Sequence, residues 1–242
     1  MNTDIPHGLD AKVQGHIGTQ ILKTLDVYRT SVRIFSGNCF QLRNLIQVLE
    51  DPANAKEMDY EQQSRQHVKN LLEEVIRYFH NFLTSVTTLV EHTRNLMGTE
   101  KRVGKSFIKI EHRNEHLAKV KTVFATDPLT QFVQDFRDYM SHYEIPLVDI
   151  TTRHNSHPPE LNVDLDYLDE NQWKGWSPTS RKFIDANKPK IRMLKLVDDY
   201  EQKVRTFHEE FLQSFERHYD REVNEACALI EEYLKLKPAT PT

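Results

Sequence analysis

The sequence predicts an all-α protein, an elongated helical bundle of long amphipathic helices with a small inserted β-hairpin. Apolar residues recur at helical spacing along most of the chain. Only 7 Gly occur in 242 residues, fewer than the turns of a β-sandwich or a doubly wound sheet need. Charged residues make up 28% of the chain and hydrophobic residues 38%, which is normal for long helices because they expose much of their circumference. We expect a single domain over residues 1–242.

Composition also restricts the function. The net charge of -4 argues against a protein covered with nucleic acid along its whole length, but leaves room for a local basic face. Cys39 and Cys227 stand far apart and outside any C-x-x-C pattern, which indicates a reducing compartment without a disulfide framework. The sequence contains neither an apolar run long enough to span a membrane nor a signal-peptide pattern. We therefore expect a cytoplasmic protein with no membrane segment and no cofactor.

The first half of the chain contains two predicted long helices. Apolar residues at helical spacing extend over residues 9–50, with Ser36-Gly37-Asn38 as a candidate kink or break. The pattern ends before residues 53–60, which have the composition of a linker. From 68 to 97 the apolar residues alternate at steps of four and three, a heptad seam that favours a multi-helix bundle. Gly98 follows where a C-cap glycine belongs.

The second half combines shorter elements with one more long helix. A helix is predicted over residues 101–125, and Thr126-Asp127-Pro128 then supplies a cap and a first-turn proline for a helix that ends near Tyr143. Alternating β-branched segments at 145–152 and 161–168 predict a β-hairpin. A loop at 169–190 follows, which holds Trp173 and Trp176 and a short helix that begins at Ser177-Pro178. Together the hairpin and this loop form an insertion at about 145–190. The last predicted element is a helix at 194–236.

The predicted helix at 101–125 carries four cations at steps of four: Lys101, Lys105, Lys109 and Arg113. Such a strip on one helix face could follow a phosphate backbone, so these residues are candidate RNA contacts. The alternative is a solvated face opposite the core. His112 and His116 are spaced to share a face of the same helix, but the Arg113 cation beside them disfavours a metal ion. We expect no metal site.

Arg137 and His142 form the other candidate site, at the end of the helix that follows. An arginine offers a planar fork for phosphate, and a histidine titrates near neutral pH. Together they could cleave RNA without a metal, because the histidine manages the proton of the 2′-hydroxyl while the arginine stabilises the developing charge. On an ideal helix their side chains point about 140° apart. They converge only if the last turn unwinds or if a second subunit adds its own pair.

The segment from Arg137 to His142 resembles the R-x4-6-H motif of HEPN-domain proteins, a family of nucleotide-binding helical bundles. The resemblance covers six residues and the all-helical context, and leaves the hairpin and the last helix unexplained. It implies a homodimer that binds RNA or cleaves it without a metal, of the toxin–antitoxin or defence type, with an antitoxin-like partner protein. Arg137 and His142 would be catalytic, and Asp138 occupies the polar position after the arginine, where the family commonly has Asn.

Two other interpretations stay open. Arg137 could pair with a nearby carboxylate while His142 caps the last carbonyls of the helix, which would make both residues structural. The whole protein could also be a non-enzymatic helical interaction or scaffold module, whose long helices dock on a partner protein or on a second copy. A shared, solvent-accessible cleft for Arg137 and His142 would favour the ribonuclease.

Overall fold

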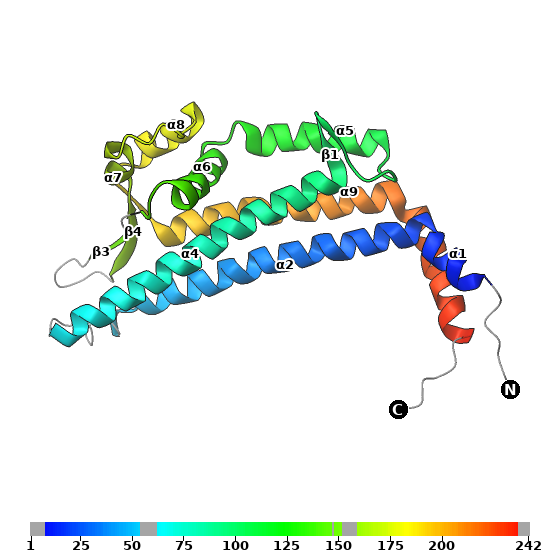
Figure 1. Cartoon of the computed structure of the whole chain (residues 1–242), viewed down its shortest axis with the longest axis horizontal. Coiled ribbons are helices and arrows are strands. Elements are labelled where there is room, and N and C mark those ends of the chain that lie inside the picture. The colour runs from blue at the N-terminus through cyan, green and yellow to red at the C-terminus, as the bar shows by residue number, and fades with distance from the viewer. Residues whose placement is uncertain (1–7, 54–61, 147, 152–158, 237–242) are drawn as a thin grey trace.

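A computed structural model of the chain describes residues 8–53, 62–146, 148–151 and 159–236. These residues form an elongated helical bundle in which the only sheets are small and antiparallel, so the predicted all-α fold with a small hairpin is confirmed (Figure 1). Nearly all of the predicted linker at 53–60 lies outside the described residues. No helix within the described ranges is long and apolar enough to cross a membrane.

Three long helices run along the bundle: α2 (Ile17–Leu49), α4 (Gln62–Met97) and α9 (Met193–Leu236) (Figure 1). α2 packs against both of the others, and the short helix α1 (Leu9–Gly15) packs against α9 and α2. The apolar stripes predicted from the sequence face the core between them. The largest buried side chains include Phe35, Phe79, Phe82, Tyr200 and Phe215.

The candidate break at Ser36-Gly37-Asn38 is wrong, because α2 runs unbroken through these residues. Phe35 and Cys39 on either side of Gly37 are buried in the core, which holds the helix in place across the glycine. Gly37 itself faces open space. A single glycine costs a helix roughly 1 kcal/mol, less than burial of the large side chain of Phe35 contributes.

The predicted helix at 101–125 begins later than expected. β1 (Gly98–Thr99) pairs with β2 (Arg102–Val103) in a tight hairpin, and α5 covers only Ile110–Val120. Gly98 has a left-handed φ of 85°, the conformation expected of a C-cap glycine. A Cβ on Gly104 would lie 2.4 Å from the carbonyl oxygen of Leu96, so these two glycines allow the chain to fold back on the end of α4.

After α5 the chain makes one π-helical turn, η1 (Lys121–Ala125), and enters α6 (Pro128–His142). The predicted start signal of α6 is confirmed, since the Asp127 side chain accepts from the backbone of Thr130 and Pro128 occupies the first turn. α8 (Pro178–Asn187) begins at its Ser177 cap as predicted and packs on α6. Trp176 is buried and stacks on Phe132 of α6, with ring centroids 5.7 Å apart.

The predicted β-hairpin is present in β3 (Val148–Thr151) and β4 (Glu160–Asp164). It is shorter than predicted, because the Asp164 side chain caps α7 (Leu165–Glu170) and ends the strand. A third strand that the sequence did not predict, β5 (Lys190–Arg192), completes the sheet in the order β3-β4-β5. The carboxylate of Glu50, at the end of α2, accepts from the backbone N–H of Leu161 at 2.9 Å and so ties this sheet to the bundle.

Candidate functional site

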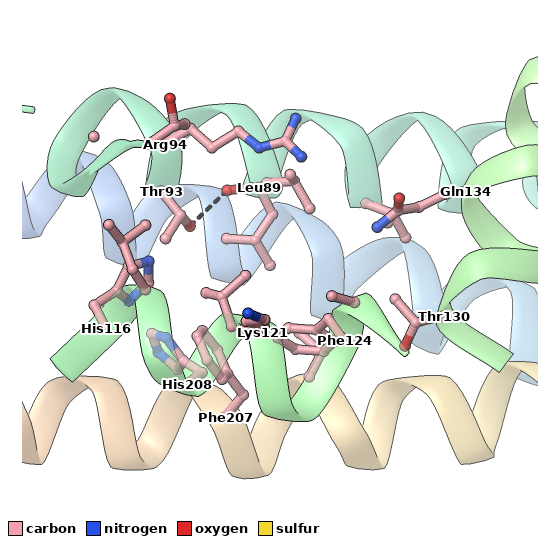
Figure 2. Close-up of a pocket in the computed structure, with 18 of the residues that line it drawn as sticks. Leu89, Thr93, Arg94, His116, Lys121, Phe124, Thr130, Gln134, Phe207 and His208 are labelled. Carbon is pink, nitrogen blue, oxygen red and sulfur yellow. Dashed lines mark hydrogen bonds between the residues drawn. The ribbon is translucent and has the colours of Figure 1, made fainter. Parts of the chain in front are cut away.

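A cavity of about 530 Å³ lies within the helical body. Its walls come from α2, α4, the β1–β2 hairpin, α5, η1, α6 and α9, and Figure 2 shows α4 and α9 on opposite sides of it. We call it the central cavity. The space is about half open to solvent, so it is a pocket between the helices and not an enclosed packing void. Most of its wall is apolar, formed by residues that include Phe35, Val86, Leu89, Phe124, Val204 and Phe207.

The π-helical turn η1 forms part of this wall. Its Phe124 ring packs edge-on against Phe207 of α9, with centroids 4.8 Å apart. A π turn widens the helix locally and re-aims its side chains, and such turns are frequent at functional sites. η1 connects α5 to α6 and so spans the length of the cavity between His116 and Thr130 (Figure 2).

Polar side chains gather at one end of the central cavity, where Figure 2 shows the buried Thr93 and His116 together with the half-buried His208. Nδ1 of His208 lies 3.1 Å from the hydroxyl of Tyr28, and the Thr93 hydroxyl donates to the carbonyl of Leu89 at 2.7 Å. His116 makes no hydrogen bond within the described chain. Burial lowers the pKa of His116 to about 4, so its imidazole is neutral at pH 7 and can donate one hydrogen bond and accept another.

The charged residues of the cavity wall are all exposed: Arg94, Glu100, Lys101 and Lys121. We call these four residues the mouth. Arg94 pairs with Glu91, which lies outside the wall, at 2.7 Å. Within the described part of the chain, the Lys101 and Lys121 side chains make no ion pair or hydrogen bond. Three of the four charges are positive, so the mouth is cationic and the interior is apolar.

The structure does not bring Arg137 and His142 together within one chain. α6 stays helical through His142, so the last turn does not unwind and the two side chains point about 140° apart. Nη1 of Arg137 pairs with Oδ1 of Asp138 at 2.8 Å, as the structural interpretation expects, while its Nε is buried without a hydrogen-bond partner. His142 is exposed and has no polar contact in the described ranges. A catalytic pair would therefore need a second copy.

The predicted basic strip does not exist as one helix face, because α5 begins only at Ile110. Lys101 and Lys105 lie in the hairpin and the loop after it. Lys109 is the N-cap of α5 and its Nζ pairs with Glu222 at 2.7 Å, and Arg113 donates to the carbonyl of Thr99. These two cations hold α5 against α9 and the hairpin. RNA binding by the four cations stays a prediction.

His112 and His116 share a face of α5, as predicted, but both rings are buried. Neither ring nitrogen of His112 has a hydrogen-bond partner, and the ring stacks on His218 with centroids 4.5 Å apart. Among the described residues, no group of three or more His, Cys, Asp or Glu side chains is placed to hold a metal ion. The pair belongs to the core, and His116 alone reaches the central cavity.

α2 exposes four large apolar residues along its middle and C-terminal part, which a partner protein could contact: Val27, Ile34, Phe40 and Val48. On an ideal helix Val27, Ile34 and Val48 point within about 60° of one another, whereas Phe40 points about 140° away from Val27. The three residues repeat at a single heptad position, which Gln41 interrupts, and so lack the second apolar position per heptad of a coiled-coil seam. The role as an interaction module therefore stays a prediction without a defined surface.

Comparisons with protein families, with curated proteins and with solved structures find no match to this chain. The central cavity is the candidate site that the sequence did not reveal. Its wall residues are the ordinary apolar and aromatic positions of helical stripes, which predict core packing. The space between them depends on how far apart α4, α5 and α9 sit, and no local pattern encodes that distance.

Proposed function

We propose that this protein binds a small, mainly apolar molecule in the central cavity. The observation that carries the proposal is the cavity itself: its volume of about 530 Å³ falls within the range of roughly 300–1,000 Å³ that is typical of small-molecule sites. Its composition also supports the proposal, because an apolar wall with a few convergent polar groups is the usual construction of such sites.

The two kinds of wall residue have different roles in this proposal. The apolar side chains remove the body of the molecule from water, which contributes about 25 cal/mol per Å² of apolar surface. Thr93, His116 and the Tyr28–His208 pair lie at one end and orient the molecule through hydrogen bonds. An unpartnered neutral imidazole such as that of His116 gains a partner when the molecule binds.

The test uses the uncharged fluorescent probe N-phenyl-1-naphthylamine, titrated into the full chain. We expect a saturable rise in fluorescence with one site per chain. Val90 lines the cavity and is partly exposed, so Val90→Phe places a ring in the cavity without overpacking the core. This variant should lose the signal and keep the melting temperature of the wild type. The matched control is Val27→Phe, on the exposed side of α2, which should bind like the wild type.

Two outcomes would overturn the proposal. The wild type could give no saturable signal, which would mean that the cavity does not accept an apolar molecule. Alternatively, Val90→Phe could bind the probe with the wild-type affinity, which would place the probe at another site.

A second candidate function is metal-independent RNA cleavage by a homodimer, in which Arg137 of one copy and His142 of the other share a site. The exposure of His142 at the free end of α6, without a polar contact in the described chain, favours this candidate. Purified protein should then degrade RNA in excess EDTA. His142→Ala and Arg137→Ala should each lower the rate by about 10²-fold or more and keep the wild-type melting temperature.

Asp138 supplies a further test of the second candidate. Its carboxylate neutralises Arg137, so Asp138→Asn should leave RNA cleavage intact or raise it by freeing the guanidinium for phosphate. If the wild type leaves RNA intact in EDTA, or if Arg137→Ala and His142→Ala lower the melting temperature without a kinetic effect, the pair is structural.

A further inference from the structure

We infer that the molecule held in the central cavity is an amphiphile with an anionic head group, which the two mouth lysines, Lys101 and Lys121, bind while its apolar tail lies inside. This inference rests on the proposed function and names the class of ligand for the same site. It follows from how charge is distributed over the cavity wall.

Charge on the wall is confined to the mouth. The four charged wall residues, Arg94, Glu100, Lys101 and Lys121, are exposed, and every buried wall residue is uncharged. His116 and His208 do not alter this separation, because burial lowers the pKa of both imidazoles. A fully charged molecule would lose its hydration inside without gaining a partner. A fully apolar molecule would make no ionic contact with the mouth, whereas an amphiphile can interact with both the apolar interior and the charged mouth.

The sign of the mouth favours an anion over a cation. Glu100 is the single acidic residue of the mouth, against three cations. Arg94 already pairs with Glu91, but Lys101 and Lys121 have no partner among the described residues. They come from different elements, the β1–β2 turn and η1. Figure 2 shows Arg94 on α4 across the cavity from Lys121 on η1. Flexible ammonium groups of this kind bind a carboxylate, sulfonate or phosphate as point charges.

The test compares two probes that share one aromatic skeleton. 8-anilino-1-naphthalenesulfonate carries a sulfonate that N-phenyl-1-naphthylamine lacks, so the ratio of their dissociation constants measures what the anionic group contributes. In the wild type we expect the sulfonate to bind about tenfold more tightly or better, and this advantage should shrink with added salt because the mouth is exposed. Only binding that Val90→Phe removes is counted, which excludes adsorption elsewhere on the surface.

Two double variants separate the effect of the mouth lysines on binding from the effect of the protein's net charge. The double variant Lys101→Gln/Lys121→Gln should bring the two dissociation constants to within about twofold of each other by weakening the sulfonate probe alone. The control Lys12→Gln/Lys105→Gln removes the same net charge from two exposed lysines outside the cavity wall and should keep the wild-type ratio. Dodecanoate should displace either probe better than dodecanol does.

Each contrary outcome has its own meaning. If neither probe binds in the cavity, the proposed function fails and the inference fails with it. If the uncharged probe binds but the sulfonate binds no better, or if Lys101→Gln/Lys121→Gln keeps the wild-type ratio, the cavity binds apolar molecules and the anionic head group is wrong. If the control double variant lowers the ratio as much, the preference comes from net charge and the mouth has no specific role.

Discussion

Lys203 of α9 donates to Oδ1 of Asp127 at 2.8 Å, while Oδ2 of the same carboxylate accepts from the backbone N–H of Thr130 at 2.8 Å and from its hydroxyl at 2.7 Å. The Asp127 side chain therefore caps the N-terminus of α6 and links it through an ion pair to α9, the longest helix of the bundle. Thr130 also belongs to the wall of the central cavity, so these contacts help to hold that wall in place.

Two substitutions at Asp127 should separate its two roles. Asparagine is an effective N-cap but carries no charge, so Asp127→Asn removes the ion pair with Lys203 and should lower the free energy of unfolding by about 1 kcal/mol. Asp127→Ala removes the cap as well and should cost about 1 kcal/mol more. Urea unfolding at pH 7 measures both. Equal stability of the two variants would show that the cap contributes nothing.

The same carboxylate should make stability depend on pH in the acid range. Burial alone would raise the pKa of Asp127, but the hydrogen bonds from Lys203 and Thr130 outweigh burial and lower it. The contribution of a carboxyl with a lowered pKa is present above its unfolded value, about 3.9, and is lost as the pH falls through the folded value. The stability difference between wild type and Asp127→Ala should therefore shrink below about pH 4. A difference that stays constant down to pH 3 would contradict the assignment.

Two glycines of α2 should respond in opposite directions to the same substitution. A Cβ on Gly18 would lie 1.8 Å from the carbonyl oxygen of Glu222, where α2 meets α9, whereas a Cβ on Gly37 meets nothing within 4 Å. Gly18→Ala should lower the free energy of unfolding by about 1–3 kcal/mol because the helices must separate. Gly37→Ala should raise it by about 0.5–1 kcal/mol because alanine favours the helix. If Gly18→Ala and Gly37→Ala shift the melting temperature in the same direction, α2 and α9 do not approach each other closely at Gly18.

The sequence predicts the long helices well because their stability depends on a repeated pattern. The seam at 68–97 places Phe79 and Phe82 in the core of α4, and both are buried. The start of α6 is equally local, since Asp127 and Pro128 act within a single turn. Patterns of this kind are decided by spacing and by neighbouring side chains, so they can be recognised without a tertiary structure.

Three features could not be predicted for a common physical reason, which is that tertiary contacts decide them. Residues 101–109 contain strong helix formers, but Gly98 and Gly104 allow a hairpin that packs on the end of α4. β5 has three residues and exists because β4 offers an open edge. The central cavity depends on the separation of helices that are distant in sequence. Lys101 and Lys121 therefore line the same cavity only in the folded chain.

The core offers a direct test of the assigned seams. Phe79 and Phe211 are 0% and 3% exposed, so Phe79→Ala and Phe211→Ala should each lower the free energy of unfolding by about 3–5 kcal/mol. Phe40→Ala is the control, because Phe40 is 59% exposed and its truncation should change stability by less than about 0.5 kcal/mol. Denaturant unfolding measures all three. Small and equal effects would mean that the two phenylalanines are not core residues.

His112 should make the fold sensitive to mild acid. Burial, followed by the charge of His218, lowers the pKa of His112 to about 4, while the unfolded chain has a value near 6.5. Between these two pKa values the His112 imidazole is protonated in the unfolded chain but neutral in the folded chain. Folding stability should therefore fall as the pH drops below about 6.5, by about 2 kcal/mol at pH 5 from this residue. His116, with its pKa also lowered to about 4 by burial, adds a loss in the same direction.

Replacing His112 with phenylalanine should remove its share of this acid sensitivity. The ring sits edge-on to Phe215 with centroids 4.7 Å apart, and neither nitrogen has a hydrogen-bond partner, so a phenyl ring fits the same aromatic surroundings without a buried polar atom. His112→Phe should match or exceed wild-type stability at pH 7 and lose about 2 kcal/mol less between pH 7 and pH 5. His80→Phe, at an exposed position of α4, should keep the wild-type slope. Urea unfolding at intervals of half a pH unit gives the slopes, and parallel curves for wild type and His112→Phe would show that the His112 imidazole is already protonated, or hydrated, in the folded chain.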